Sequence, residues 1–353
     1  MLPDTPKLLE RLSQFVVDER AVQFRDSDAL LSHLKFLPET SYQEIGRSRE
    51  GRPLYGVSFG TGKFPVSIIA GSHADEPVGP MTAQALPLFL AESFPEFLEC
   101  CTFRVVPQMN PDGANRNRGW FKSPPDFKTY LRHAVRELPG DDIEFGFTEE
   151  GSARPECRAA MAFLRGGVPP RIHASLHGMG YAEGAWFLLC KEWAEAACPL
   201  MDAMASLCTR MRFPLHDIDR QGEKGFTRIQ SGFCTTPTST AMRAHFLAGG
   251  DLKTAPLFQP SSMEFARSLG GNPLCLVTEM PLFLIHGASS LEDPIYWRFR
   301  NAVAEARATG DLESLERGFN VQAVPIAFQM KMQLAYLLLG IQQAAAASGG
   351  PLP

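Results

Sequence analysis

Two histidines and two glutamates follow apolar runs that are typical of buried strands. His73 and Glu76 come after VSIIAGS, His177 comes after IHASL, and Glu279 comes after LCLVT. In open α/β sheets the ligand crevice lies outside the carboxyl ends of the strands. We therefore expect these side chains, which are far apart in the sequence, to meet at one crevice.

Two imidazoles and a carboxylate can hold Zn²⁺ in three positions and leave a fourth for water. The metal lowers the pKa of that water from about 15.7 toward ~7, and a second carboxylate can take the proton and pass it to a leaving amine. We predict one zinc ion per chain on His73, Glu76 and His177, with Glu279 as the base. Taken alone the pattern is weak, because a histidine in a strand turn is more often structural.

Short apolar runs alternate with helical patterns along the chain. The alternation predicts an α/β fold, in which a mixed, mostly parallel twisted sheet has helices on both faces, in a single domain. We expect strands at 54–59, 66–70, 103–106, 172–176 and 274–278, and helices at 82–93 and 156–164. A helix over 126–137 is expected to cover the site.

The N-terminal part has apolar residues at helical spacing, among them Leu8, Leu9 and Leu12. This spacing predicts a helical segment over residues 1–41, including 19–37, ahead of a catalytic domain at 42–345.

Composition excludes several classes of protein. The chain has 353 residues and a formal net charge of -5, so it has no basic excess with which to bind nucleic acid. No apolar run reaches the roughly 18 residues that span a bilayer, so no membrane partner is expected. The start lacks the pattern of a secretory signal and the eight cysteines form no CxxC pair, which favours reduced thiols in the cytoplasm. The oligomeric state is left open.

Longer motifs surround the four residues. IGRSREGRPLYGVSFGT (45–61) precedes the turn with His73 and Glu76, NPDG (110–113) follows a strand, and PECRA (155–159) opens a helix before SLHG (175–178). With H-x-x-E and T-E in the same order, these motifs resemble the zinc carboxypeptidase family, the carboxypeptidase A-like metallopeptidases, over about residues 42–285.

The resemblance implies a single α/β domain with a twisted mixed sheet of about eight strands between helices. It also implies that His73, Glu76 and His177 bind zinc, and that Glu279 is the general base and acid that drives water onto the scissile carbonyl. An arginine that stabilises the developing oxyanion is expected as well.

That arginine has two possible positions, because the family's longer insertion after NPDG is missing or collapsed here. If ANRN matches the later family element, Asn115 and Arg116 bind a substrate carboxylate; if NRGW matches the earlier one, Arg118 lies beside the carbonyl. We predict Asn115 and Arg116 as substrate-binding and Arg118 as catalytic. A simple salt bridge on a loop is the alternative for either arginine.

Two departures from the family concern substrate binding. Tyr181 and Tyr296 are consecutive tyrosines, so none lies about twenty residues before Glu279, and Asp75 stands where many digestive members have arginine. These changes leave the zinc chemistry intact but favour small or unusual substrates.

Three functions follow from these observations. The first is a carboxypeptidase-type zinc metallopeptidase that hydrolyses a peptide amide bond. The second is a zinc amidase or deacylase of a small acylated amino acid or cell-wall peptide. The third is a non-catalytic zinc-binding interaction protein on the same fold. Among the remaining polar residues, we expect His173 to be structural and the acidic pairs to be solvated loop charges, namely Asp141, Asp142, Glu149 and Glu150, the last of which lies outside the described residues.

Overall fold

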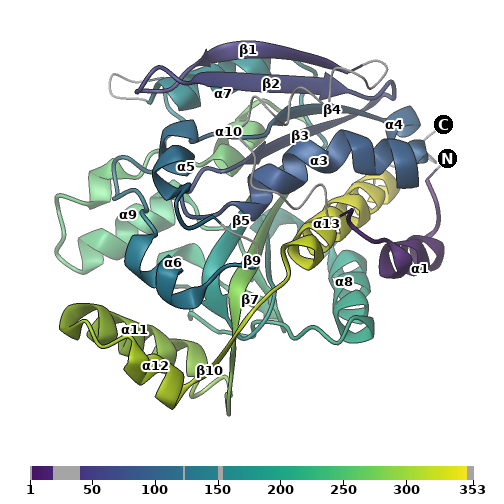
Figure 1. The fold of residues 1–353 in the computed structure, drawn as a ribbon. Coiled ribbons are helices and arrows are strands. Elements are labelled where there is room, and N and C mark those ends of the chain that lie inside the picture. The colour runs from purple at the N-terminus through teal and green to yellow at the C-terminus, as the bar shows by residue number, and fades with distance from the viewer. Residues whose placement is uncertain (1, 19–39, 122–123, 150–153, 348–353) are drawn as a thin grey trace.

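One mixed sheet of ten strands forms the centre of the computed structural model, which describes residues 2–18, 40–121, 124–149 and 154–347 (Figure 1). The strands run in the order β1-β2-β4-β3-β5-β9-β6-β8-β7, and β10 pairs with β9. Their bounds are β1 (Ser41–Arg47), β2 (Pro53–Phe59), β3 (Phe64–Ala70), β4 (Cys101–Val106), β5 (Ile172–Ala182), β6 (Trp186–Leu189), β7 (Arg228–Gln230), β8 (Phe233–Thr235), β9 (Leu274–His286) and β10 (Asn320–Ala323).

The middle of the sheet is parallel and its flanks are mixed. β4, β3, β5 and β9 are parallel neighbours, whereas β1 and β2 on one side and β6 on the other add antiparallel pairs. β3 and β5 are buried along almost their whole length, as expected for parallel strands covered on both faces. The prediction of a mixed α/β sheet is confirmed. The sheet has more strands than the expected eight. β7, β8 and β10 have only three or four residues, and such short strands show no periodic pattern in the sequence.

Helices cover both faces of the sheet. α3, α8 and α13 pack on one face together with α1, and α7 and α10 pack on the other, as Figure 1 shows for α3 and α13 in front of the strands. The α-helices are α1 (Thr5–Gln14), α3 (Val78–Ser93), α4 (Pro95–Cys100), α5 (Pro111–Asn117), α6 (Phe127–His133), α7 (Pro155–Arg165), α8 (Cys198–Arg210), α9 (Ser239–Ala248), α10 (Ser262–Ser268), α11 (Ile295–Thr309), α12 (Glu313–Gly318) and α13 (Ile326–Ala347).

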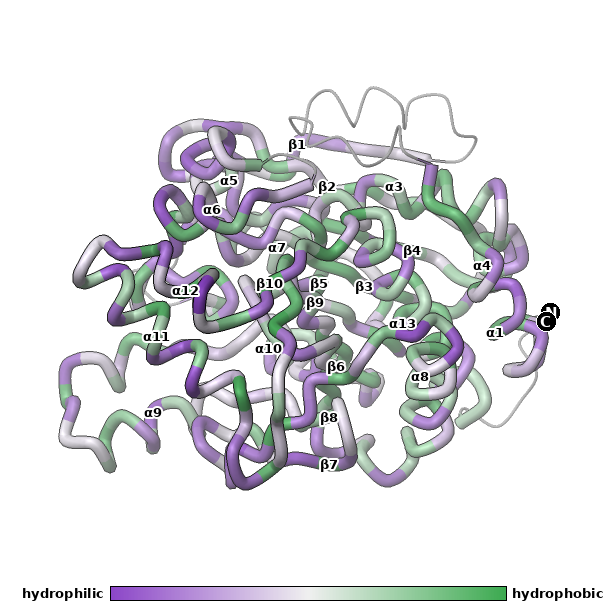
Figure 2. Tube along the Cα trace, turned by 60° about the horizontal axis from the view of Figure 1, so that its bottom comes forward, coloured by the Kyte–Doolittle hydropathy of each residue, from purple (hydrophilic) through white to green (hydrophobic). Residues whose placement is uncertain are grey.

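Burial explains the character of the two longest central helices. α3 and α13 are apolar on nearly all sides because each is packed between the sheet and other helices, and α13 contacts α3, α8 and β9. Figure 2 shows hydrophobic segments along the central strands and these helices, and hydrophilic loops around them.

The predicted helices are found with shifted ends. α3 begins earlier than the expected 82–93, and α7 brackets 156–164. The helix expected over 126–137 is shorter, because α6 ends at His133 with Ala134 in an extended conformation. α1 is the helix found in the N-terminal segment, and it packs against α8 and α13. Residues 19–37 lie outside the described residues, so the division at residue 41 stays a prediction.

All eight cysteines are free thiols, and Cys198 is the exposed one. Within the ranges that the structure describes, no helix has the length and apolar character needed to cross a membrane.

Candidate active site

His73 and Glu76 lie on the loop that joins β3 to α3. Gly71, directly after β3, has a φ of +71°, and a Cβ there would lie 2.2 Å from Oε1 of Gln108. Glycine is therefore needed at the start of this loop. Later in the loop the backbone N–H of Glu76 donates to the carbonyl oxygen of His73 at 3.4 Å, which closes a turn with both side chains on one side.

The first turn of α3 lies directly against β5. A Cβ on Gly79 would lie 2.0 Å from the carbonyl oxygen of Leu176, the residue before His177. Only a residue without a side chain permits this approach, which brings the β3–α3 loop up to the strand that carries His177.

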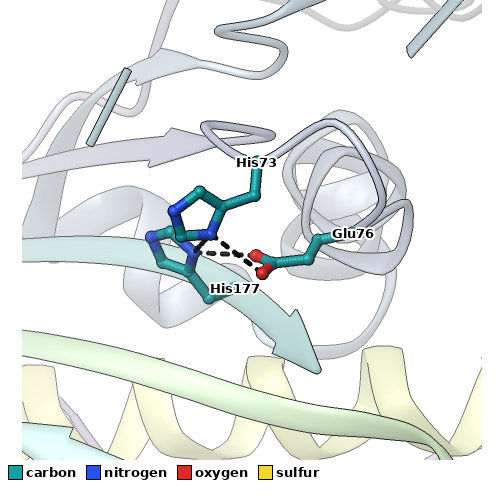
Figure 3. A group of neighbouring side chains, drawn as sticks. All are labelled: His73, Glu76 and His177. Atoms are coloured by element: carbon teal, nitrogen blue, oxygen red, sulfur yellow. Dashed lines mark hydrogen bonds and ion pairs between the residues drawn. The ribbon is translucent and has the colours of Figure 1, made fainter. Parts of the chain in front are cut away.

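The three predicted ligands converge (Figure 3). Nδ1 of His73 lies 2.8 Å from Oε1 of Glu76, Nδ1 of His177 lies 2.8 Å from Oε2 of Glu76, and the two Nδ1 atoms are 3.0 Å apart. The ligand atoms of the three residues all lie within 4.8 Å of one another, so they could hold a metal ion. His177 and Glu76 are buried, and His73 is partly exposed.

The other nitrogen of each imidazole faces a carboxylate. Nε2 of His73 lies 3.5 Å from Asp142, and Nε2 of His177 lies 3.1 Å from Glu144. Such partners fix the orientation of metal-binding imidazoles. The expectation that Asp142 is a solvated loop charge was wrong, because its side chain is 21% exposed and lies beside His73, whereas Asp141 is exposed, as expected.

Glu144 is held by several donors besides His177. It accepts hydrogen bonds at 3.1 Å from Oγ of Ser72 and Oγ of Ser175, and from the backbone N–H of Ser262 at 3.2 Å. Burial by itself raises the pKa of Glu144, but the hydrogen bond and charge of His177 outweigh it, and the pKa lies below its ordinary value. The sequence gives no pattern for this residue, since its partners come from three separate segments.

Arg136 contacts the ligands directly. Its guanidinium donates to Oε1 of Glu76 at 2.8 Å, approaches Nδ1 of His73 at 2.9 Å, and lies 3.3 Å from Asp75. The side chain is 48% exposed, so it also faces solvent. Sequence reasoning missed Arg136, which lies in the segment after α6 and outside every motif.

Asn117 positions that segment. Its Oδ1 accepts from the backbone N–H of Val135 at 2.8 Å, and its Nδ2 donates to the carbonyl oxygen of Val135 at 2.8 Å. Asn117 is fully buried. The residue directly before Arg136 is thus fixed by both of its backbone polar groups.

The NPDG motif has a structural part in the site. Asn110 caps α5 through Gly113 and donates to Glu137 at 2.7 Å. The other oxygen of Glu137 accepts from the backbone N–H of Ala74, between the two ligands of the loop. Asp112 accepts from Ser48 and from the backbone N–H of Glu50, within the 45–61 motif.

The other three predicted residues lie at the end of α5. Asn115, Arg116 and Arg118 are exposed. Arg116 donates to Glu50 at 2.8 Å and lies 3.9 Å from Glu137. The arginine found against the ligands is Arg136, so the roles of Asn115, Arg116 and Arg118 stay predictions.

Glu279 lies beside His177 in the sheet. The two residues are register partners in the parallel pair β5–β9, and Trp186 is the partner of Glu279 on the other side. Neighbouring strands are about 4.8 Å apart and their paired side chains share a face. The expectation that His177 and Glu279 lie past the ends of their strands was wrong, because β5 and β9 continue to Ala182 and His286. Only β3 ends before its polar residues, at Ala70.

The charges of the site influence one another. Burial, and next the charge of Glu76, raises the pKa of Glu279 to about 8. Burial and Arg136 lower the pKa of His73, but Glu76 and Asp142 raise it to about 9 overall. The pKa of Glu279 thus depends on the charges of the predicted metal ligands.

A buried glutamine supports His177 from the opposite face of the sheet. Gln333 of α13 donates to the carbonyl oxygen of His177 at 2.8 Å and to Oγ1 of Thr278 at 3.1 Å, and it accepts from Thr82 of α3 at 2.6 Å. This network joins the strands of His177 and Glu279 to two helices.

The donor set fits zinc. Two imidazole nitrogens and one carboxylate are a usual protein ligand set of catalytic zinc, and carboxylates next to the remaining imidazole nitrogens are the usual second layer. His173, by contrast, is fully buried, with Nδ1 2.8 Å from Oγ of Ser67 and away from the ligands.

Comparisons with known proteins concern the family and the fold. The family model described as zinc carboxypeptidase matches residues 30–184, which include His73, Glu76 and His177 but not Glu279. No curated protein matches the chain by sequence.

Several solved structures share the fold. A metallo-carboxypeptidase from Burkholderia cenocepacia is similar with a TM-score of 0.54 and 16% identity, over 91% of this chain and 68% of that one. Carboxypeptidase A from Helicoverpa armigera has a TM-score of 0.56 and 14% identity, and the match covers 98% of this chain and 80% of that one. Bovine thrombin-activatable fibrinolysis inhibitor, in complex with tick carboxypeptidase inhibitor, has a TM-score of 0.54 and 14% identity, and the match covers 93% of this chain and 98% of that one.

Proposed function

This chain is a zinc metallocarboxypeptidase-like hydrolase, and from that premise we propose that it hydrolyses a peptide amide bond with Glu279 as general base. One observation carries the proposal: the ligand atoms of His73, Glu76 and His177 lie within 4.8 Å of one another, with Glu279 next to His177 in the sheet. A non-catalytic binding protein has no use for this second carboxylate.

Zinc on the three ligands would supply a Lewis acid that polarises a carbonyl and acidifies water. Glu279 accepts the proton of the attacking water and later donates it to the leaving amine. The positive charge of a metal ion would lower the pKa of Glu279 from the value of about 8 in the metal-free protein, so that the carboxylate form is available near neutral pH.

We assign the oxyanion role to Arg136 ahead of Arg118. The Arg136 guanidinium already lies 2.8 Å from Glu76, so it is next to the position of a polarised carbonyl. A fixed cation at this place stabilises the negative charge that develops on the carbonyl oxygen. Arg118, at the end of α5, is the second candidate.

One contact supports the second candidate function, the hydrolysis of a small acylated amino acid. Arg116 is predicted to bind a free substrate carboxylate together with Asn115, but Glu50 already occupies it at 2.8 Å. A C-terminal peptide carboxylate would have to displace Glu50 there. Substrates that do not rely on Arg116 avoid this competition.

The test combines metal analysis with a substrate panel. We expect one zinc per chain, loss of activity with a chelator, and turnover of blocked dipeptides. Turnover of N-acyl amino acids alone would replace the peptidase by the deacylase, and a metal-free, inactive protein would contradict both.

The first prediction concerns Glu279→Gln. Removing the base should lower turnover about 10²–10⁴-fold while zinc content stays the same. Glu313→Gln, an exposed glutamate paired with Lys128, is the control and should be unchanged. Undiminished turnover in Glu279→Gln would eliminate the base role.

We place this activity in the cytoplasm, which suits the eight free thiols.

A further inference from the structure

A second cavity lies at the opposite edge of the sheet from the metal ligands. It has a volume of about 730 Å³ and lies at the amino ends of β3, β4 and β5, under α7 and α10. Leu164, Ala266 and Leu269 form apolar walls, and Val168, which is 72% exposed, marks its mouth. Along β5, His173 near this cavity and His177 in the active site are separated by about 13 Å at about 3.3 Å per residue.

Arg104 is the charged group that lines the cavity from within the sheet. Its guanidinium lies 4.2 Å over the ring of Phe163 and donates through Nη2 to the carbonyl oxygen of Phe163. Gly167 makes room for it, since a Cβ there would lie 2.5 Å from Cδ of Arg104. The side chain is thus held in one place by an aromatic ring and a glycine.

The Arg104 guanidinium has unused hydrogen-bonding capacity. Its Nε is buried and has no acceptor, and within the described residues no carboxylate pairs with the guanidinium. A guanidinium keeps its charge when it is desolvated, and an unpaired charge away from water is costly. An anion in the cavity beside Arg104 would offset this cost.

The polar groups are gathered on the strands. Oγ of Ser67 lies 2.8 Å from Nδ1 of His173, and Ser67 and Thr102 line the cavity beside Arg104, with Lys63 at the exposed rim. Among the described residues that line the cavity, none is acidic. The cavity therefore has a cationic, hydroxyl-bearing floor and apolar walls.

We propose that this cavity is a binding site for a small monocarboxylate with an aliphatic body. The carboxylate accepts hydrogen bonds from Arg104, and from Ser67 once its hydroxyl turns away from the carbonyl oxygen of Ile172, which accepts from it at 3.4 Å. The aliphatic body packs on Leu164, Ala266 and Leu269. A phosphate is disfavoured, because it would bring more charge than one guanidinium neutralises and would leave the apolar walls without a partner.

The test uses the zinc-loaded full chain and methyl NMR, which reads the cavity and the active site separately. Hexanoate should give saturable shifts at Leu164, Val168 and Leu269, with binding about tenfold tighter than that of uncharged hexanol. Inorganic phosphate should give none. Equal binding of hexanol, phosphate binding in place of hexanoate, or shifts confined to residues near the ligands, such as Leu176, would overturn the proposal.

Variants separate binding from folding. Arg104→Met keeps the length of the side chain and should weaken hexanoate about tenfold, whereas Arg171→Met, at the same edge of the sheet but not in the lining, should not. If Arg104→Met does not fold, Ala266→Leu fills the cavity, keeps Arg104 and should abolish the shifts. Unchanged hexanoate binding in the variant that folds would contradict the site.

Discussion

Arg136 and a metal ion would compete for the same lone pairs on Glu76 and His73. The guanidinium contacts Oε1 of Glu76 and Nδ1 of His73, which are atoms with which these residues could hold a metal ion. Asp75, 3.3 Å away, offers the guanidinium a second carboxylate. Metal binding would therefore shift Arg136 toward Asp75 and keep its charge beside the reacting carbonyl.

Replacing Arg136 should separate binding of the metal from catalysis. We expect Arg136→Ala to lower turnover about 10²–10³-fold, as for the loss of one oxyanion donor, without lowering zinc affinity, because a competing cation is removed. Arg132→Ala, an exposed arginine at the end of α6, is the control and should change neither quantity. A loss of zinc affinity in Arg136→Ala would show that the guanidinium supports the ligands instead.

Zinc affinity should rise with pH. The pKa of His73 is raised from its ordinary 6.5 to about 9 in the metal-free protein, chiefly by Glu76 and Asp142 against the effects of burial and Arg136. Burial also lowers the pKa of His177, but Glu76 and Glu144 raise it well above its ordinary value. Below pH 9 zinc must therefore displace protons from both imidazoles, so the apparent affinity should increase at least about tenfold per pH unit between about pH 7 and 9. Competition with a chelator of known pH dependence measures this, and a constant affinity over that range would contradict it.

The ligands could be predicted from the sequence, but their supports could not. His73, Glu76 and His177 each follow an apolar strand pattern, and parallel strands bring such positions together. Arg136 and Glu144 lie in irregular segments, where no periodic pattern indicates which way a side chain points. Their place depends on backbone contacts such as those of Asn117 with Val135, which only the folded chain shows.

At the scale of elements, the close packing of α3 on β5 sets the distance between the two histidines. Gly79 is the contact point, and its missing side chain leaves the carbonyl oxygen of Leu176 just enough room. A glycine in the first turn of a helix has no evident reason in the sequence, so this contact could not be predicted.

Gly79→Ala should move α3 away from β5. The added Cβ would meet backbone and not a flexible side chain, so we expect a destabilisation of about 1–3 kcal/mol, together with weaker zinc binding. Gly119→Ala is the control, since nothing lies within 4 Å of a Cβ there. Denaturant unfolding of the metal-free proteins measures the difference, and equal stability of the two variants would contradict the proposed role of Gly79.

The elements with strong patterns were predicted and the short ones were not. β3, β5 and β9 show continuous apolar runs because they are buried on both faces. β8 and β10 pair with strands far along the chain, and β7 pairs with β8, which follows it directly; three or four residues are too few to show any of these strands locally.

At the scale of the whole molecule, the site depends on α13. Gln333 is fully buried and reaches across to His177 and Thr278 on the two strands that carry chemistry. Gln333→Leu should cost about 1–3 kcal/mol, because buried polar groups lose their partner, and should weaken zinc binding about 10–100-fold. Gln343→Leu on the same helix, whose side chain contacts Ala196 at the surface, should have little effect on either. If both variants bind zinc equally well, Gln333 has no part in shaping the site.

The bond between Gln333 and His177 joins positions 156 residues apart. During translation, the two histidines and Glu76 emerge from the ribosome long before α13 has been synthesised. At first the nascent polypeptide contains the three ligands but not Glu279, and after Glu279 has followed, the carbonyl oxygen of His177 still lacks the amide of Gln333. The order of synthesis would thus keep the enzyme latent during translation until α13 is in place.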